Sequence, residues 1–170
     1  MGDSGIINVL VVKNKRGRVV MSNTLNEQFK LISEYCEKLE EADYDSYKIY
    51  SPVSEDDILK WQEENNITLP ENLKNWYLLS NGFDMGTTVD ILPLTAICKY
   101  PFDDIDELEE AFIVGHYIGD GSVLVIDRNG NFYEFDHGYS KLYPTPFEKF
   151  IKKWIIDNLE DCMADAGLFE

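Results

Sequence analysis

The chain has 170 residues, and its hydrophobic content of 44% with 13% aromatic residues is typical of a globular protein and not of a disordered acidic tail. Its 32 acidic residues against 15 basic ones give a formal net charge of −17. Such a charge disfavours direct binding to nucleic acid or to an anionic membrane, and it accelerates association with a basic partner. An acidic surface that serves solubility alone would have the same net charge.

The cysteines point to a reducing compartment. Cys36, Cys98 and Cys162 are odd in number and far apart, and no CxxC motif occurs. The sequence therefore indicates neither a disulfide framework nor a zinc cluster. We expect a soluble, cytoplasmic protein that needs no metal and no cofactor.

Residues 1–20 differ from the rest of the chain in charge. They carry Lys13, Lys15, Arg16 and Arg18 against one acid, Asp3. The segment is either a basic leader, with Met21 as the natural initiator, or an edge hairpin built from two β-branched runs around a polar turn. Its apolar run over residues 6–12 is too short for a membrane span and lacks the features of a signal peptide. Residues 21–170 are expected to form a single domain.

Four helices are predicted from a shared N-terminal signal, a Thr or Ser followed three residues later by an acid. The pairs are Thr24 with Glu27, Ser54 with Asp57, Thr68 with Glu71 and Thr145 with Glu148. Each pair precedes apolar residues at helical spacing. The predicted helices cover about residues 24–42, 54–66, 69–80 and 146–160. The aromatic residues of the last helix, Phe147, Phe150 and Trp154, are expected in the core.

Between the third and the last helix the pattern changes to that of strands. A short strand over residues 89–94 ends at Pro93, and three runs over about 111–136 predict an antiparallel meander. Asn129-Gly130 suits a tight hairpin turn, and Asp120-Gly121 suits the other one. The prediction is an α+β fold with an antiparallel-rich sheet and the helices packed on it.

No catalytic motif stands out in the sequence, so we do not expect an enzyme. His137 follows Asp136 after a strand, and a small hydrolase that used this pair remains an alternative. Residues 127–131 resemble the opening of a calcium loop. However, Phe132 replaces the required glycine and Gly138 replaces the required glutamate. A hairpin turn explains these residues without metal.

The densest acidic cluster lies in residues 103–110, where Ile105 and Leu108 are spaced to anchor a short helix while the acids face water. The cluster is either a solvated face or a docking surface for Lys and Arg side chains of a partner. Its carboxylates belong to Asp103, Asp104, Asp106, Glu107, Glu109 and Glu110.

Residues 52–157 resemble the SUKH superfamily, which includes fungal cell-wall-synthesis regulators and many bacterial immunity proteins. The resemblance begins with a helix, followed by a Leu-Pro that opens a second helix ending in Asn-Gly, and it continues through residues 90–94, 118–138 and 145–155. The matching positions are Ser54, Trp61, Leu69, Pro70, Trp76, Leu79, Asn81 and Gly82. These residues are caps, turns and core aromatics, so the resemblance implies a fold and supplies no active site.

The resemblance implies a bacterial immunity protein, or antitoxin, that binds and neutralises a cognate polymorphic toxin. A toxin that is a nuclease must be basic to hold phosphate, and an acidic chain suits that partner. The expected contacts are the six acids named above, with exposed aromatic residues Tyr100, Tyr117 or Tyr139 as anchors. The alternative is a non-catalytic intracellular regulator or scaffold protein that resembles the cell-wall regulators. The oligomeric state is left open, with a monomer slightly favoured.

Overall fold

The computed structural model describes residues 23–44, 47–86, 88–101, 106–117, 121–127, 129–136 and 141–169. The helices are α1 (Asn23–Glu41), α2 (Glu55–Asn65), α3 (Glu71–Leu79), α4 (Phe147–Phe150) and α5 (Asp157–Asp165), with short helical turns η1 (Leu94–Ala96), η2 (Asp106–Leu108) and η3 (Ile151–Ile156). The strands are β1 (Lys48–Ile49), β2 (Phe83–Asp84), β3 (Val89–Ile91), β4 (Cys98–Lys99), β5 (Phe112–Tyr117), β6 (Val123–Ile126), β7 (Phe132–Asp136) and β8 (Lys141–Pro144). The predicted segment 1–20 and the turn at Asp120 lie outside the described residues.

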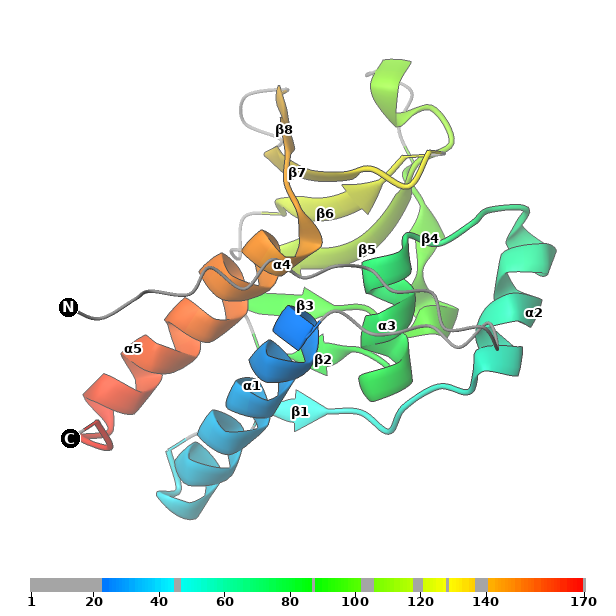
Figure 1. Ribbon diagram of the computed structural model, residues 1–170. Coiled ribbons are helices and arrows are strands. Elements are labelled where there is room, and N and C mark those ends of the chain that lie inside the picture. The colour runs from blue at the N-terminus through cyan, green and yellow to red at the C-terminus, as the bar shows by residue number, and fades with distance from the viewer. Residues whose placement is uncertain are drawn as a thin grey trace, which may run out of the picture.

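The strands form one antiparallel sheet in the order β1-β2-β3-β5-β6-β7-β8 (Figure 1). β4 pairs with Ile113 and Phe112 of β5, on the edge where β3 pairs with residues 115–117. β5, β6 and β7 are the predicted meander, and the predicted α+β class is confirmed. A bulge at Val114 shifts the register between β5 and β6, which increases the local twist of the sheet.

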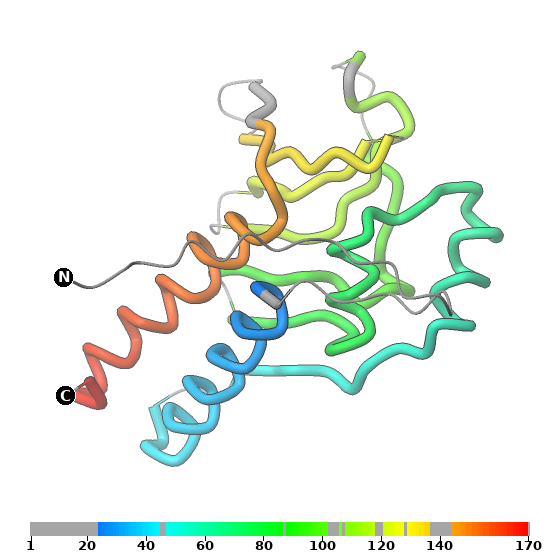
Figure 2. The backbone as a smooth tube through the Cα atoms, in the orientation of Figure 1, coloured from blue at the N-terminus to red at the C-terminus, as the bar shows by residue number. Residues whose placement is uncertain are grey.

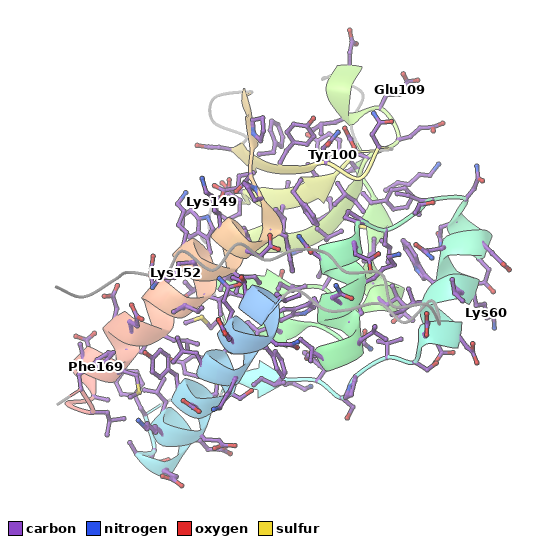
Figure 3. All side chains as sticks on the ribbon, in the orientation of Figure 1. Lys60, Tyr100, Glu109, Lys149, Lys152 and Phe169 are labelled. Carbon is purple, nitrogen blue, oxygen red and sulfur yellow. The ribbon has the colours of Figure 1, made fainter. Side chains whose placement is uncertain are left out.

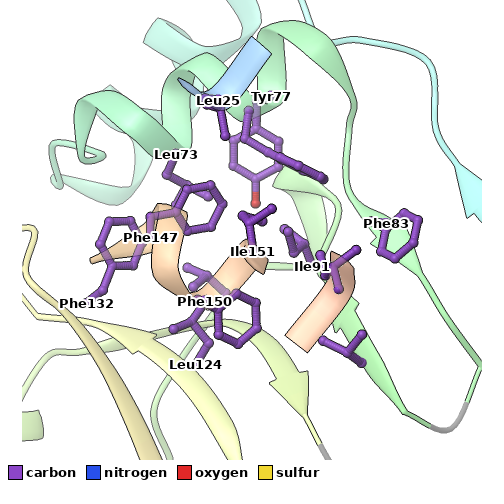
Figure 4. Close-up of a cluster of buried hydrophobic side chains, with 14 of the residues drawn as sticks. Leu25, Leu73, Tyr77, Phe83, Ile91, Leu124, Phe132, Phe147, Phe150 and Ile151 are labelled. Carbon is purple, nitrogen blue, oxygen red and sulfur yellow. The ribbon is translucent and has the colours of Figure 1, made fainter. Parts of the chain in front are cut away.

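The helices cover one face of this sheet and enclose the larger core. Phe147, Phe150 and Ile151 of the last helical segment meet Leu73 and Tyr77 of α3 above the strands (Figure 4). All five are fully buried. The Tyr77 hydroxyl donates a hydrogen bond to the Leu92 carbonyl at 2.8 Å, so its one polar atom is satisfied inside the core.

The last helical segment runs without a break from α4 through η3 to α5, beside α1 (Figure 2). Its middle, η3, is a π-helical turn, in which the Asp157 amide donates to the Lys152 carbonyl five residues earlier. This wider turn places residues five apart on one face of the helix. The prediction of one helix over 146–160 is confirmed, and the π turn was not predicted.

The predicted caps are correct at one helix. The Ser54 hydroxyl accepts a hydrogen bond from the Asp57 amide at 3.1 Å and caps α2. α1 already begins at Asn23, whereas α3 and α4 are preceded by Pro70 and Pro146 with no side-chain cap. A proline in that position fixes φ near its helical value, which starts the helix without a hydroxyl.

The end of α3 ties three elements together. The Ser80 hydroxyl accepts a hydrogen bond from the Tyr50 amide, and the Asn81 side-chain oxygen accepts one from the Leu94 amide. Gly82 has φ +105°, and a Cβ added there would lie 2.6 Å from the Ile91 carbonyl oxygen. Because only glycine permits this approach, Ser80-Asn81-Gly82 is a junction between α3, the β1 edge and β3. The cap residue Ser80 is extended, and the positive φ at the end of α3 falls on Gly82.

The opposite face of the sheet carries a smaller core. There, Tyr100 after β4 and Leu108 of η2 pack with Val123, Val125 and Phe135 of β6 and β7. Leu108 is fully buried, so it anchors the acidic segment as predicted, while Ile105 lies outside the described residues.

Candidate functional site

The acidic segment lies on the surface above the smaller core. Asp106, Glu109 and Glu110 are exposed, whereas nothing beyond the backbone is described for Glu107. Asp103 and Asp104 lie outside the described residues. Glu110 has φ 60°, in the left-handed region, and closes the turn that returns the chain to β5. The structure therefore presents at least part of the predicted carboxylate cluster to solvent on a turn fixed by Leu108.

The expectation of exposed aromatic anchors is wrong for two of the three tyrosines. Tyr100 is 7% exposed because its ring packs edge-on against Phe135, at 5.7 Å between ring centroids. Tyr117 is 4% exposed and packs against Trp154 and Phe150. Tyr139 lies outside the described residues, as does His137 of the alternative hydrolase pair.

An exposed apolar side chain stands instead on α2. Leu59 is 50% exposed, and the residues three and four positions from it include the exposed acids Glu55, Asp56 and Glu63. A shallow hollow of about 400 Å³ follows from Leu59 to Asn66. A second hollow of about 120 Å³ continues from Asn66 to Glu110. Lys99 also lines this second hollow. We call the surface from Glu55 on α2, through both hollows to Glu110 and its neighbour Glu109, the acidic face, since its exposed acids outnumber its lysines.

A larger pocket, of about 590 Å³, lies between the sheet and the last helical segment. We call it the Trp154 pocket. Figure 3 places Lys149 and Lys152 on this side of the molecule, away from Lys60 of α2 and from Glu109 of the acidic face. The two surfaces are therefore separate. The pocket is lined by Tyr117, Ser122, Glu134, Asp136, Pro144, Thr145, Lys149, Lys152, Lys153, Trp154 and Asp157.

A carboxylate, an ammonium and an indole meet in this pocket. The Lys153 ammonium lies 3.1 Å from Glu134 Oε2 and 4.3 Å from the centroid of the Trp154 ring. The Trp154 ring is 4.6 Å from that of Tyr117. The Glu134 side chain is 10% exposed, whereas that of Lys153 is 58% exposed. A nearly buried acid is thus paired with a cation that reaches it from solvent.

Lys152 is held by two other acids on the same helix. Its ammonium forms ion pairs with Asp157, five residues on, and with Glu160 at 3.2 Å. The π turn explains the first of these, because it aligns residues five apart. The hydrogen bond that Lys152 donates to Asp157 is the main cause that raises the pKa of Lys152. Lys152 is therefore neutralised locally, and its charge contributes little to the pocket.

A second polar pair lies on the sheet face opposite the helices. His116 Nδ1 is 2.9 Å from Asp90 Oδ1 across the β3–β5 pairing, and the His116 amide donates to the same oxygen at 2.7 Å. The hydrogen bond to Asp90 raises the pKa of His116, and partial burial opposes that shift. Across the described chain, no group of three or more His, Cys, Asp or Glu residues is arranged to hold a metal ion.

Sequence reasoning missed the Trp154 pocket, although two signals for it were present. Glu134 and Asp136 alternate on β7, so their side chains share one face of the strand. Lys149, Lys152 and Lys153 are spaced by three and four residues, so they share one side of a helix. Trp154, predicted as core, is half-buried and forms a wall of the pocket.

The chain is similar to a known protein family and, over a short stretch, to a human protein. A family model described as the SMI1 / KNR4 family (SUKH-1) matches residues 52–162. A stretch of 40 residues is 40% identical to the human protein tubulin polyglutamylase complex subunit 2. That match covers 24% of this chain and 13% of the human protein's length. Within the described part of the chain, no helix has the length and apolar character needed to cross a membrane.

Proposed function

Since the chain belongs to the SMI1/KNR4 (SUKH-1) family, we propose that it is an immunity protein that binds a cognate toxin domain and neutralises it. The toxin is a basic protein, and a nuclease fits this description because it must hold phosphate. The activity is stoichiometric binding without catalysis, in the bacterial cytoplasm. The resemblance to bacterial immunity proteins and the net charge of −17 support this proposal.

The observation that carries the proposal is the acidic face. It combines exposed carboxylates on α2 and on the turn after η2 with one exposed leucine, Leu59. Exposed carboxylates steer a basic partner towards the surface and increase its association rate. A central apolar side chain then supplies a contact from which water is excluded. Leu59 takes the anchoring role that was expected of Tyr100 and Tyr117.

The proposed mechanism is occlusion. A basic toxin surface that holds the phosphates of a nucleic acid is complementary to the acidic face, so binding there competes with the substrate. Each exposed ion pair contributes only about 0–1 kcal/mol, so the charges set the rate and the choice of partner more than the affinity. Asp103, Asp104 and Glu107 belong to the same proposed contact set by their place in the sequence.

The test is protection of cells from a toxin. A basic toxin domain encoded by a neighbouring gene is the candidate to test, expressed with the wild-type chain or with a Glu63→Lys/Glu109→Lys variant. We expect the wild-type chain to restore growth and to co-purify with the toxin domain at a ratio of about one to one. The variant should protect less, at equal expression. Growth that no amount of the wild-type chain restores would contradict the proposal for that toxin.

The alternative is a regulatory or scaffold protein that resembles the cell-wall regulators. The observation that favours it is the presence of two separate surfaces, the acidic face and the Trp154 pocket, which suit more than one partner. A scaffold would bind several proteins with modest affinity, whereas an immunity protein has one tight partner. Affinity capture with the wild-type chain, followed by measurement of each captured protein's Kd, distinguishes the two.

A further inference from the structure

We infer that the Trp154 pocket is a receptor for a basic side chain of a partner protein, arginine above all, and that Lys153 occupies it in the unbound chain. Lys153 already shows the geometry of such a complex. Its ammonium is 3.1 Å from Glu134 Oε2 and lies over the Trp154 ring at 4.3 Å. A carboxylate beside an aromatic face is the environment that a protein cation favours.

The two members of this pair differ in how firmly they are held. Glu134 is in the middle of β7, where it is opposite Leu124 on β6 and Tyr143 on β8, and its side chain is 10% exposed. A carboxylate this buried requires a cation beside it. Lys153 meets that need from a side chain that is 58% exposed, so it can leave towards solvent. A partner's cation can therefore replace Lys153 without leaving Glu134 unpaired.

The rest of the pocket suits a larger cation than the lysine that now fills part of it. Its volume of about 590 Å³ lies within the usual range for ligand pockets. Asp136, two residues after Glu134, lines the same side. A guanidinium is planar and can stack on the Trp154 ring while it donates two hydrogen bonds to one carboxylate. These properties favour arginine over lysine as the incoming group.

The neighbouring lysines do not reverse this preference. Lys152 is paired with Asp157 and Glu160, so its charge is compensated on its own helix. Lys149 is exposed at the rim. A phosphate or carboxylate ligand would use Lys149, but it would also have to approach the nearly buried carboxylate of Glu134. The pocket therefore favours a cation at its base.

This inference rests on the proposed function for the identity of the partner, since a basic toxin presents arginine side chains. Its chemistry can be tested without any toxin. The probe is N-acetyl-arginine methylamide, and the neutral control is the corresponding citrulline compound, which has nearly the same shape. Binding is followed by the NMR shifts of the Trp154 indole and of the β7 amides, in the full chain.

We expect Lys153→Ala to bind the arginine probe about tenfold more tightly than the wild-type chain, because the competing ammonium is gone. The matched control Lys149→Ala removes the same charge from the rim and should change the affinity by less than about threefold. Lys153→Ala/Glu134→Gln should lose the gain. Thermal unfolding of each variant establishes that it is folded, and the probe should raise the Tm of Lys153→Ala more than that of the wild-type chain.

Three results would overturn the inference. The first is a folded Lys153→Ala variant that binds the probe no better than the wild-type chain does. The citrulline compound could bind as well as the arginine compound. Inorganic phosphate could bind in the pocket and lose affinity in Lys149→Ala, which would assign the site to an anion. None of these measurements involves a toxin. Failure of the proposed function can therefore be distinguished from failure of the inference about the pocket.

Discussion

At the scale of single residues, the pair of His116 and Asp90 links protonation to stability. His116 is half-exposed and lies on the sheet face opposite the helices, where Asp84 and Lys48 continue the same row of side chains across β2 and β1. Its raised pKa means that the folded state binds a proton more tightly than the unfolded state, where the value is 6.5. The pair therefore stabilises the fold fully below pH 6.5 and loses this contribution as the pH rises through the raised pKa.

The expected result is a small decrease in the free energy of unfolding above pH 6.5, of less than about 1 kcal/mol because the pair is open to solvent. Urea unfolding of the wild-type chain and of Asp90→Asn across this range measures it. The variant should show a flatter pH dependence. A wild-type slope that Asp90→Asn leaves unchanged would mean that other groups titrate there.

Glu134 is a charged residue in the interior of a strand, and it depends on another element for its counter-charge. Its neighbours on β7, Phe132 and Phe135, are buried apolar side chains, and its own carboxylate depends on Lys153 for a counter-charge. A buried carboxylate without a partner is costly, so Glu134 requires a cation beside it. That cation can come from Lys153 or from a partner protein. This property allows the pocket to exchange one cation for another.

At the scale of elements, the start of α2 differs from the starts of α3 and α4. Ser54 is the one residue of the four predicted caps whose hydroxyl accepts a hydrogen bond from the first turn of its helix. Ser54→Ala should therefore lower the free energy of unfolding by about 1 kcal/mol. Thr68→Ala is the matched control, and its cost should be within about 0.5 kcal/mol of zero because α3 begins at Pro70.

Denaturant unfolding of both variants decides this comparison. Equal costs at Ser54 and Thr68 would contradict the assignment of the caps. The comparison is informative because the two sites have the same Thr/Ser-x-x-acid pattern in the sequence.

The elements that could be predicted are those with a long or regular pattern. Helix α1 and the meander were predicted to within a few residues, since apolar periodicity extends over several turns or three strands. β1, β2 and β4 have two residues each, too few to show an alternation, and pairing within the sheet alone defines them. Proline replaced the expected hydroxyl caps because the same four-residue pattern permits either start.

The candidate sites also have parts that could be predicted from the sequence and parts that could not. The acidic segment and its Leu108 anchor were visible as a run of carboxylates around two apolar residues, Ile105 and Leu108, at helical spacing. The burial of Tyr100 could not be predicted, because it depends on contacts with Val123, Val125 and Phe135, which are distant in the sequence. The Trp154 pocket forms only because β7 packs against the last helical segment. This is a tertiary contact that neither segment reveals by its own sequence.

At the scale of the whole molecule, charge is unevenly distributed between the two surfaces. The acidic face has Glu55, Asp56 and Glu63 on α2 and continues to the carboxylates after η2. The lining of the Trp154 pocket has three lysines and three acids, and two of the lysines, Lys152 and Lys153, are ion-paired, so the pocket presents little net charge. Long-range attraction of a basic partner is therefore expected at the acidic face, and short-range recognition of one cationic side chain at the pocket.

The most direct test of the central claim is the association rate constant between this chain and its toxin, measured by stopped flow at low and high salt. We expect the rate to fall by about tenfold or more as salt rises, and by a similar factor in Glu63→Lys/Glu109→Lys at low salt. Glu37→Lys/Glu41→Lys, a reversal of two exposed charges on α1, is the matched control and should change it far less. A rate that depends neither on salt nor on the charges at Glu63 and Glu109 would contradict the claim that the acidic face steers and binds the partner.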